Sequence, residues 1–516
     1  MTHKRQRYAL LHVTDKTGIV ELAWALQGLG FQFIADGATA ATLRQAELKV
    51  ADLRELLGLA EAPDPELGLA HPDVLASILA DRQAGSIGDQ PQRRLLDIDL
   101  VAVNLYPLAE ISEAELSQSE ALRTVDLAAS ALLRAAARNF SQVLCLCDPE
   151  DYRAAADALR QDCEIRLVRR QALAAKAFHY CAYYDTTIAQ YLGSRWDKLP
   201  HEFVVGLRKT ADFRYGENMH QQAALYALSG ARPWGVNEAE LLYGQPMSFN
   251  HYIDLDAAWE LAGGFPEPAC AIVKHGVPAG VAVSKSLSDA ARLAYRGDPR
   301  GCFRGTAAVN REVTQEAAAF FAEEAINCIA APAFSAKALL ALKAKKDIRL
   351  VTLPSTLISA HELDLRSVAG GVLVQDQDHG ALPDTLKIPT KRAPTEPEMN
   401  SLRLAWRTAK HSRTHAAVIC RGGQTLGIGS GQTCRLDAVR LALSKSQDRH
   451  PIVTPDLPTV LASDGVLSAE HVLEAAKGGV TAIIQPGYSS EDAEAIAACD
   501  RHAVAMPVTG VRHFRH

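Results

Sequence analysis

Short apolar runs alternate with helical periodicity along the first part of the chain. An apolar run at 8–13 is followed by a helical pattern from Ile19 to Gly30, and further buried-strand patterns lie at 98–108 and 141–148. Because strands that alternate with helices form parallel sheets, these patterns predict a parallel α/β domain. Ligands of such sheets bind at the carboxyl ends of the strands. The loops expected there are 14–18, 36–39 and 104–107.

A helical stretch over 165–200 connects to a region with a different pattern of apolar residues. From about residue 201, apolar strands are separated by alanine-rich helices. The strands are predicted at 269–276, 416–423 and 480–487. A stretch rich in proline and charge at 377–400 is the predicted internal boundary or surface loop. The expected domains are therefore 1–200, including the helical connection, and 201–516, the second with two α/β subdomains.

Composition excludes several classes of protein. The chain has 516 residues, a net charge of −6 and 48% hydrophobic residues, which is typical of soluble globular proteins. It has no global basic footprint for nucleic acid, and no apolar stretch approaches the roughly 20 residues of a membrane span. The ten cysteines include no Cys-x-x-Cys pair, so neither a disulfide framework nor a cysteine-based zinc site is predicted. We expect a reduced, cytoplasmic protein that requires no metal.

Five segments of the larger region carry candidate chemistry. They are FRYGENMHQQAALY (213–226), SFNHYIDLDAAWEL (248–261), IVKHGVPAGVAV (272–283), GIGSGQTCRLDAVRLA (427–442) and GVRHFRH (510–516). Singly, each has an ordinary interpretation: KH is a strand end, GIGSGQ lacks the GK[ST] ending of a phosphate loop, and HFRH is a solvated tail. Together, their order and spacing resemble the PurH family, the bifunctional transformylase and cyclohydrolase of purine biosynthesis. Matches to DKTG, NLYP and RAAARN extend the resemblance over nearly the whole chain.

The resemblance implies a fold and a reaction. The first domain would resemble methylglyoxal synthase, and the larger region would be a duplicated α/β fold similar to cytidine deaminase, although the chain lacks the H-x-E…C-x-x-C zinc set. The family transfers a formyl group from 10-formyltetrahydrofolate to the amine of AICAR, and its first domain closes the product to IMP. AICAR and folate would be the partners of a homodimer with sites between subunits. A monovalent cation is compatible with the family.

Formyl transfer to this amine needs catalytic help. The amine is conjugated with a carboxamide and is a poor nucleophile, so a base, oxyanion stabilisation and a proton for the leaving nitrogen are needed. By resemblance, Lys274 and His275 are the catalytic pair. Imidazole exchanges protons near neutral pH, so His275 is the expected base or relay, and Lys274 would stabilise the oxyanion or protonate the leaving nitrogen. His415 stands where the family has an asparagine that helps to hold the formyl group.

Substrate-binding residues are carried over motif by motif. Arg214 and Tyr215 resemble nucleotide contacts, because the Arg214 guanidinium suits a phosphate or a carboxamide. Asn250 resembles a base-reading residue. The glycine-containing loop at 427–432 is expected to let backbone approach the ligand. The remaining candidate substrate contacts are Gly431, Gln432, Arg435, Arg512 and His516.

The first domain departs further from the family. Its family segment G-R-V-K-T-L-H-P-K-V-H-G-G reads PELGLAHPDVLAS at 65–77, so Glu66 replaces the arginine, Gly68 the catalytic lysine and Leu69 the threonine. Two unit charges about 4 Å apart interact by about 4 kcal/mol at an effective dielectric of about 20, so a charge reversal is costly. Asp36 also stands where a hydroxyl should face phosphate. Residues kept in part are Lys16, Thr17, Tyr106, Asp126 and Arg138. We expect a family-type fold that cyclises poorly or not at all.

Four hypotheses follow from these patterns. The chain is an active transformylase with a weak cyclohydrolase domain, a fully bifunctional enzyme, a silent nucleotide- or folate-binding paralogue, or a formyltransferase for a different amine. The retained pair Lys274 and His275 favours catalysis. Departures at His415, at Asn327, which replaces an acidic residue, and at 466–470 keep the last two hypotheses open.

Overall fold

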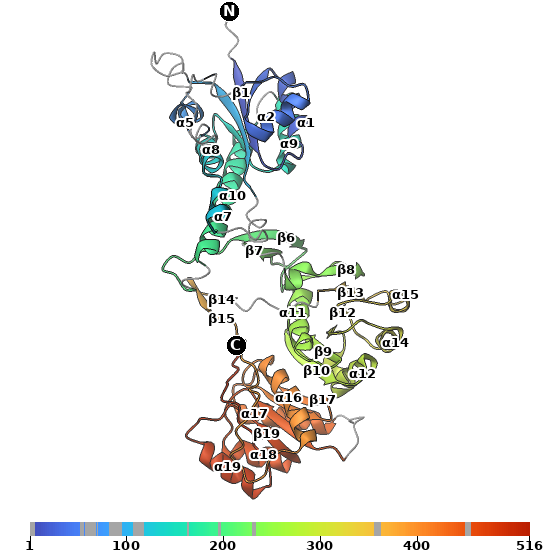
Figure 1. The fold of residues 1–516 in the computed structure, drawn as a ribbon. Helices are drawn as coiled ribbons and strands as arrows, with labels where there is room; N and C mark the ends of the chain where they lie inside the picture. The colour runs from blue at the N-terminus through green and yellow to red at the C-terminus, as the bar shows by residue number, and fades with distance from the viewer. Residues whose placement is uncertain are drawn as a thin grey trace, which may run out of the picture. The chain divides into compact units, whose positions relative to one another are not determined.

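A computed structural model describes most of the chain. The described residues are 6–51, 56, 69, 71–81, 95–106, 118–162, 165–193, 198–229, 234–354, 363–448 and 456–516. The chain divides into two compact units, the first made of Met1–Arg208 and Ala227–Arg232 and the second of Lys209–Tyr226 and Pro233–His516 (Figure 1). Over the described ranges, each helix is too short or too polar to cross a lipid bilayer.

The first unit is built on a five-stranded parallel sheet in the order β3-β2-β1-β4-β5. Its strands are β1 (Arg7–Val13), β2 (Phe31–Ile34), β3 (Val50–Ala51), β4 (Ile98–Asn104) and β5 (Leu144–Leu146). All seven residues of β4 are buried, as expected for a strand covered on both faces. The predicted parallel α/β domain is confirmed.

Helices connect these strands and cover the sheet. They are α1 (Ile19–Gly28), α2 (Gly37–Gln45), α5 (Pro72–Leu79), α7 (Gln118–Arg123), α8 (Leu127–Arg138), α9 (Glu150–Asp162) and α10 (Leu167–Gly193). The alanine-rich face of α8 packs against β4 and α10, which places the start of α8 near the carboxyl end of β4. Asp126 caps α8 by accepting a hydrogen bond from Ala129 N at 2.8 Å.

The second unit contains one ten-stranded sheet in the order β19-β18-β16-β17-β10-β9-β11-β12-β13-β8. Its strands are β8 (Glu240–Tyr243), β9 (Ala269–Lys274), β10 (Val277–Val283), β11 (Thr306–Val309), β12 (Cys328–Ala331), β13 (Arg349–Thr352), β16 (Ala417–Arg421), β17 (Gln424–Gly429), β18 (Thr459–Ser463) and β19 (Val480–Ile484). The β10–β17 pairing joins strands from both sides of the predicted boundary at 377–400, so the two α/β halves share a sheet.

Further helices belong to the second unit, and two ribbons lie outside both large sheets. The helices are η2 (Gly235–Glu238), α11 (Phe249–Gly263), α12 (Leu287–Gly297), α13 (Pro299–Cys302), α14 (Gln315–Glu323), α15 (Ala336–Lys343), α16 (Glu396–Lys410), α17 (Arg435–Asp448), α18 (Ala469–Lys477) and α19 (Asp492–Arg501). The ribbons pair β6 (Leu207–Phe213) with β7 (Ala223–Leu228) and β14 (Leu363–Val368) with β15 (Gly371–Asp376).

Two glycines of the GIGSGQ segment have a packing role. A Cβ at Gly427 would lie 2.0 Å from Ala442 O, and one at Gly429 would lie 2.0 Å from Ala438 O, so only glycine lets α17 lie this close to β17. Gly431 has φ +68°, a conformation that favours glycine. Helix packing therefore accounts for the first two glycines, whereas Gly431 shapes the loop itself.

The cysteines behave largely as small buried hydrophobic residues. Of the nine in the described part of the chain, only Cys434 is exposed, and all nine are free thiols. Burial raises the pKa of Cys145 to about 12 and that of Cys328 likewise to about 12, which keeps these thiols protonated and unreactive.

Candidate functional site

The predicted catalytic pair lies on a tight turn between β9 and β10. Lys274 pairs with Val277, so His275 and Gly276 are the two central residues of the hairpin. Both have positive φ, 58° for His275 and 69° for Gly276, as a type I′ turn requires. The imidazole of His275 is exposed, while Lys274 Nζ donates to Phe303 O at 2.8 Å. The turn therefore presents a histidine to solvent beside an ammonium group.

The loop carrying Arg214 and Tyr215 is anchored to α11. Phe213, at the end of β6, packs edge-on against Phe249 with ring centroids 6.1 Å apart. Asn250 Nδ2 donates to Glu217 O at 3.3 Å, which ties the loop to the first turn of the helix. Arg214 is exposed and Tyr215 half-buried. The guanidinium is therefore accessible to an anionic ligand.

Strand directions bring the candidate residues of the two halves to one edge of the sheet. β9 ends at Lys274, and β17 runs parallel to it because both pair antiparallel with β10. The end of β17, followed by Gly431 and Gln432, therefore lies at the same edge as the Lys274 end of β9. β16 runs antiparallel to β17, so His415, just before β16, also lies there. This juxtaposition could not be deduced from the motifs alone.

Arg435 is buried in an ion pair. Its Nη1 donates to Ser463 Oγ at 2.7 Å and to Asp464 Oδ1 at 2.5 Å, and the side chain of Asp464 is 0% exposed. Asp464 also accepts from Ala416 N at 3.0 Å, next to His415. The guanidinium thus fixes the backbone beside His415, and its proposed contact with substrate stays a prediction.

His415 occupies the position of the family asparagine in a confined environment. Burial and the nearby Arg435 charge lower the pKa of His415, so its ring is neutral near pH 7. Its Nδ1 is buried without a hydrogen-bond partner in the described part of the chain. Its ring lies 6.4 Å from that of Phe514. A neutral imidazole can donate one hydrogen bond and accept another, as an amide can.

The C-terminal segment, 510–516, lies next to His415. The Arg512 guanidinium stacks on Phe514 at 4.2 Å, and the ring of His516 lies edge-on to Phe514 at 6.2 Å. His516 O accepts a hydrogen bond from Arg366 at 3.4 Å. Arg512 and His516 are therefore grouped around one aromatic ring, which itself contacts His415.

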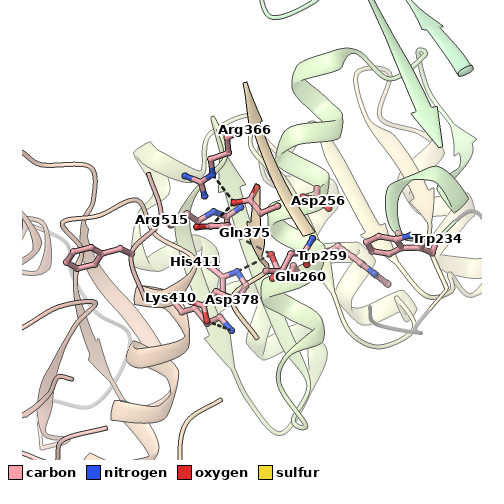
Figure 2. A pocket seen from close by; sticks show the side chains of 14 residues that line it. Trp234, Asp256, Trp259, Glu260, Arg366, Gln375, Asp378, Lys410, His411 and Arg515 are labelled. Carbon is pink, nitrogen blue, oxygen red and sulfur yellow. Dashed lines mark hydrogen bonds and ion pairs between the residues drawn. The ribbon is translucent and has the colours of Figure 1, made fainter. Parts of the chain in front are cut away.

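A charged pocket of about 260 Å³, which shares Phe514 and Arg366 with this group, also lies in the second unit (Figure 2). It is lined by Trp234, Gly235, Asp256, Trp259, Glu260, Asp364, Arg366, Gln375, Gln377, Asp378, Lys410, His411, Phe514 and Arg515. Burial opposes ionisation of Glu260, but contact with His411 and the charges of Arg515 and Lys410 lower its pKa to about 2. Asp256 keeps an exposed surface, but protein atoms packed around its carboxyl and the charge of Glu260 raise the pKa of Asp256 to about 6. The motif comparison missed this cluster, although the spacing of Asp256 and Glu260 places both on one helix face.

In the first unit, His12 lies near the carboxyl end of β1, between two carboxylates. Its Nδ1 lies 2.8 Å from Asp36 Oδ1, and its Nε2 lies 3.4 Å from Asp126 Oδ2. Burial works against the imidazolium, but the two carboxylates outweigh it and raise the pKa of His12 to about 9. The position expected to face phosphate therefore carries an internal ion cluster. His12 lies three residues before the DKTG motif but was not selected from the sequence.

The kept residues of the first unit lie in different places. Lys16 Nζ donates to Thr14 O at 3.2 Å, and Thr17 N donates to Asp15 Oδ1 at 2.9 Å. Tyr106 is half-buried, and Arg138 is exposed in the last turn of α8. Glu66 and Gly68 lie outside the described residues, whereas Leu69 is 2% exposed and packs in the core.

No group of three or more histidine, cysteine, aspartate and glutamate side chains is arranged to hold a metal ion in the described ranges.

Comparison with known proteins is consistent with this geometry. A sequence model for the AICARFT/IMPCHase bienzyme matches residues 136–445, and one for the MGS-like domain matches residues 18–127. The bifunctional purine biosynthesis protein PurH of Persephonella marina is 38% identical, over 99% of this chain and 100% of that protein. The PurH of Chloroflexus aurantiacus is 43% identical over 98% of each chain. A solved structure, titled "Crystal structure of ForH", is 31% identical and covers 36% of this chain and all of its own, with a TM-score of 0.33.

The matched models and the two folds define an α/β bienzyme of purine biosynthesis. The chain belongs to the AICARFT/IMPCHase bienzyme family. The PurH proteins are relatives that it matches over nearly their full length. The predicted family, the MGS-like first domain and the α/β class of the larger region are confirmed.

Proposed function

We propose that the second unit transfers a formyl group from 10-formyltetrahydrofolate to the amine of AICAR, and that the first unit does not cyclise the product. The observation that carries the first part is the exposed Lys274–His275 turn at the sheet edge shared with Gln432 and His415. The observation that carries the second is the His12 cluster with Asp36 and Asp126.

In the proposed reaction, His275 and Lys274 of the turn assist successive steps. The amine nitrogen attacks the formyl carbon, and His275 accepts the proton that the amine loses. Lys274 stabilises the negative charge that forms on the formyl oxygen, and the leaving folate nitrogen takes its proton from Lys274 or from the protonated His275. When the carbon–nitrogen bond to folate breaks, the products are formyl-AICAR and tetrahydrofolate. A positioned acid or base contributes roughly 10²–10⁴ to such a rate.

The proposed substrate contacts lie around the turn. Exposed Arg214 suits the phosphate or carboxamide of AICAR, and Asn250 holds the Arg214 loop through Glu217 O. His415 takes over the hydrogen bond of the family asparagine. Arg435 acts by holding Asp464 and the backbone at Ala416.

A phosphate would meet unfavourable charge in the first unit. Asp36 and Asp126 lie at the strand ends where such sheets bind ligands, and His12 is engaged by both. Lys16 is engaged by a backbone carbonyl. A phosphate would have to displace these carboxylates from the imidazolium. Loss of cationic side chains at 66 and 68 removes further attraction.

We also propose a homodimer. The β14–β15 ribbon, outside the ten-stranded sheet, exposes apolar side chains, as expected for a contact surface between copies. They are Leu365, Val368, Val372 and Leu373. Sedimentation equilibrium should give twice the mass of the 55.6 kDa chain; a monomer at micromolar concentration would contradict this.

Separate titrations test the proposal. AICAR and 10-formyltetrahydrofolate are titrated singly by calorimetry and then combined in a turnover assay. Turnover supports an active transformylase. Binding of both without turnover favours the silent paralogue, and absence of AICAR binding together with folate binding favours a different amine substrate.

A further inference from the structure

We propose that Asp254 is a positioning residue that fixes the Lys274–His275 turn in its reactive conformation. The carboxylate of Asp254, from α11, accepts a hydrogen bond from Gly276 N at 2.7 Å. Gly276 is the second central residue of the turn and follows His275 directly. The inference rests on the proposed formyl transfer, which it deepens by adding a residue that acts through the turn.

The turn needs support from outside because its own conformation is costly. His275 has φ 58°, a region that non-glycine residues rarely occupy, although histidine enters it more readily than most. Such a conformation is costly and persists only where the surroundings enforce it. Asp254 supplies such a constraint through its hydrogen bond with Gly276 N.

The environment strengthens this contact. Asp254 is half-buried, and burial raises the pKa of its carboxyl while the Gly276 amide and His275 counteract that effect. A carboxylate that accepts a backbone N–H in a partly buried place forms a charge-assisted bond, roughly twice as strong as a neutral one. The contact is therefore suited to hold a strained turn.

The same helix positions the substrate loop. Asn250 and Asp254 are four residues apart on α11, so their side chains project from one face. Asn250 holds Glu217 O in the Arg214 loop, and Asp254 holds Gly276 N in the catalytic turn. One helix face thus sets the separation between the candidate nucleotide contact and the candidate base.

Kinetics of Asp254→Ala and Asp254→Asn test the inference. Asp254→Ala removes the acceptor, and displacement of a catalytic group by about 1 Å can cost about 100-fold, so kcat should fall roughly 30- to 100-fold. KM for AICAR should stay within about threefold, because Arg214 is unaffected. Asp254→Asn keeps an acceptor oxygen and should retain kcat within about threefold. Glu316→Ala, an exposed first-turn carboxylate of α14, is the control and should match the wild type.

Hydrogen–deuterium exchange gives a readout that does not depend on activity. The peptide spanning 273–279 should exchange faster in Asp254→Ala than in the wild type and remain protected in Asp254→Asn. If the wild-type protein shows no formyl transfer, the proposed function fails, and this exchange comparison alone decides whether Asp254 holds the turn. Unchanged exchange in Asp254→Ala would overturn the inference.

A second variant covers the case in which Asp254→Ala does not fold. Gly276→Ala strains the same contact from the donor side and should lower kcat at least tenfold, about 1.4 kcal/mol, with AICAR affinity retained. Wild-type kcat in folded Gly276→Ala and Asp254→Ala, or an equal loss in Asp254→Asn, would overturn the role of the hydrogen-bond acceptor.

Discussion

His12 Nδ1 lies 2.8 Å from Asp36 Oδ1 at the carboxyl edge of the first sheet, where proteins of this fold class bind ligands. Asp126 approaches the other ring nitrogen at 3.4 Å, so one imidazole links the starts of α2 and α8. The first unit therefore uses this edge for an internal ionic contact. This ionic contact should also make the stability of the first unit depend on pH.

Stability of the first unit should depend on the protonation of His12. Its pKa is raised to about 9, so the stabilisation is complete below the pKa of an unfolded histidine, about 6.5, and is lost as the pH rises through about 9. The wild type should therefore be more stable than His12→Gln at pH 6, with the difference shrinking toward pH 9.5. Thermal unfolding of both proteins at each pH measures this. A difference that does not depend on pH would contradict the ionic contact.

Arg435→Ala should be strongly destabilising. The substitution leaves Asp464, which is 0% exposed, without its cationic partner, and breaking a buried pair costs about 3–5 kcal/mol. Arg440 forms an exposed pair with Glu474, so Arg440→Ala should cost no more than about 1 kcal/mol. Chemical unfolding compares the two. Equal effects would show that the Arg435 pair contributes no more than a surface contact.

Gly429→Ala should destabilise the second unit by about 2 kcal/mol or more. The added Cβ would lie 2.0 Å from Ala438 O, so strand and helix must separate, and overpacking of this kind costs about 1–3 kcal/mol. Gly28 has free space around its Cα, and Gly28→Ala is expected to be neutral or stabilising by up to about 1 kcal/mol. Denaturant midpoints give the comparison, and an unperturbed Gly429→Ala protein would exclude the packing role.

His275→Ala should abolish formyl transfer while AICAR affinity stays within about tenfold, a difference of about 1.4 kcal/mol. The imidazole is exposed on the turn, and Asn250 ties down the Arg214 loop through Glu217 O. Turnover and calorimetric titration measured on the same preparation separate the two effects. Loss of binding with residual catalysis would contradict its role as base.

The sequence predicted the first fold well because its signals are local. The patterns at 98–108 and 141–148 contain short apolar runs, and β4 and β5 lie within these ranges and are buried throughout. The pairing of strands that are far apart in the chain could not be predicted. The β10–β17 contact that joins two halves into one sheet depends on residues far apart in the chain, and no local pattern encodes it.

The candidate site shows the same contrast between local patterns and long-range contacts. Motif order named Lys274, His275 and the C-terminal residues as candidates, but it could not show that Arg435 is engaged by Asp464, because a motif names a residue without naming its partner. His12 was missed for a related reason. Its significance comes from Asp36 and Asp126, which approach it only in the folded sheet.

A single time course with AICAR and 10-formyltetrahydrofolate, following formyl-AICAR and IMP separately, tests the central claim most directly. The account predicts that formyl-AICAR accumulates in proportion to tetrahydrofolate while IMP stays at the level of a reaction without enzyme. IMP formed at the rate of formyl transfer, or no formyl-AICAR and no IMP at all, would contradict it.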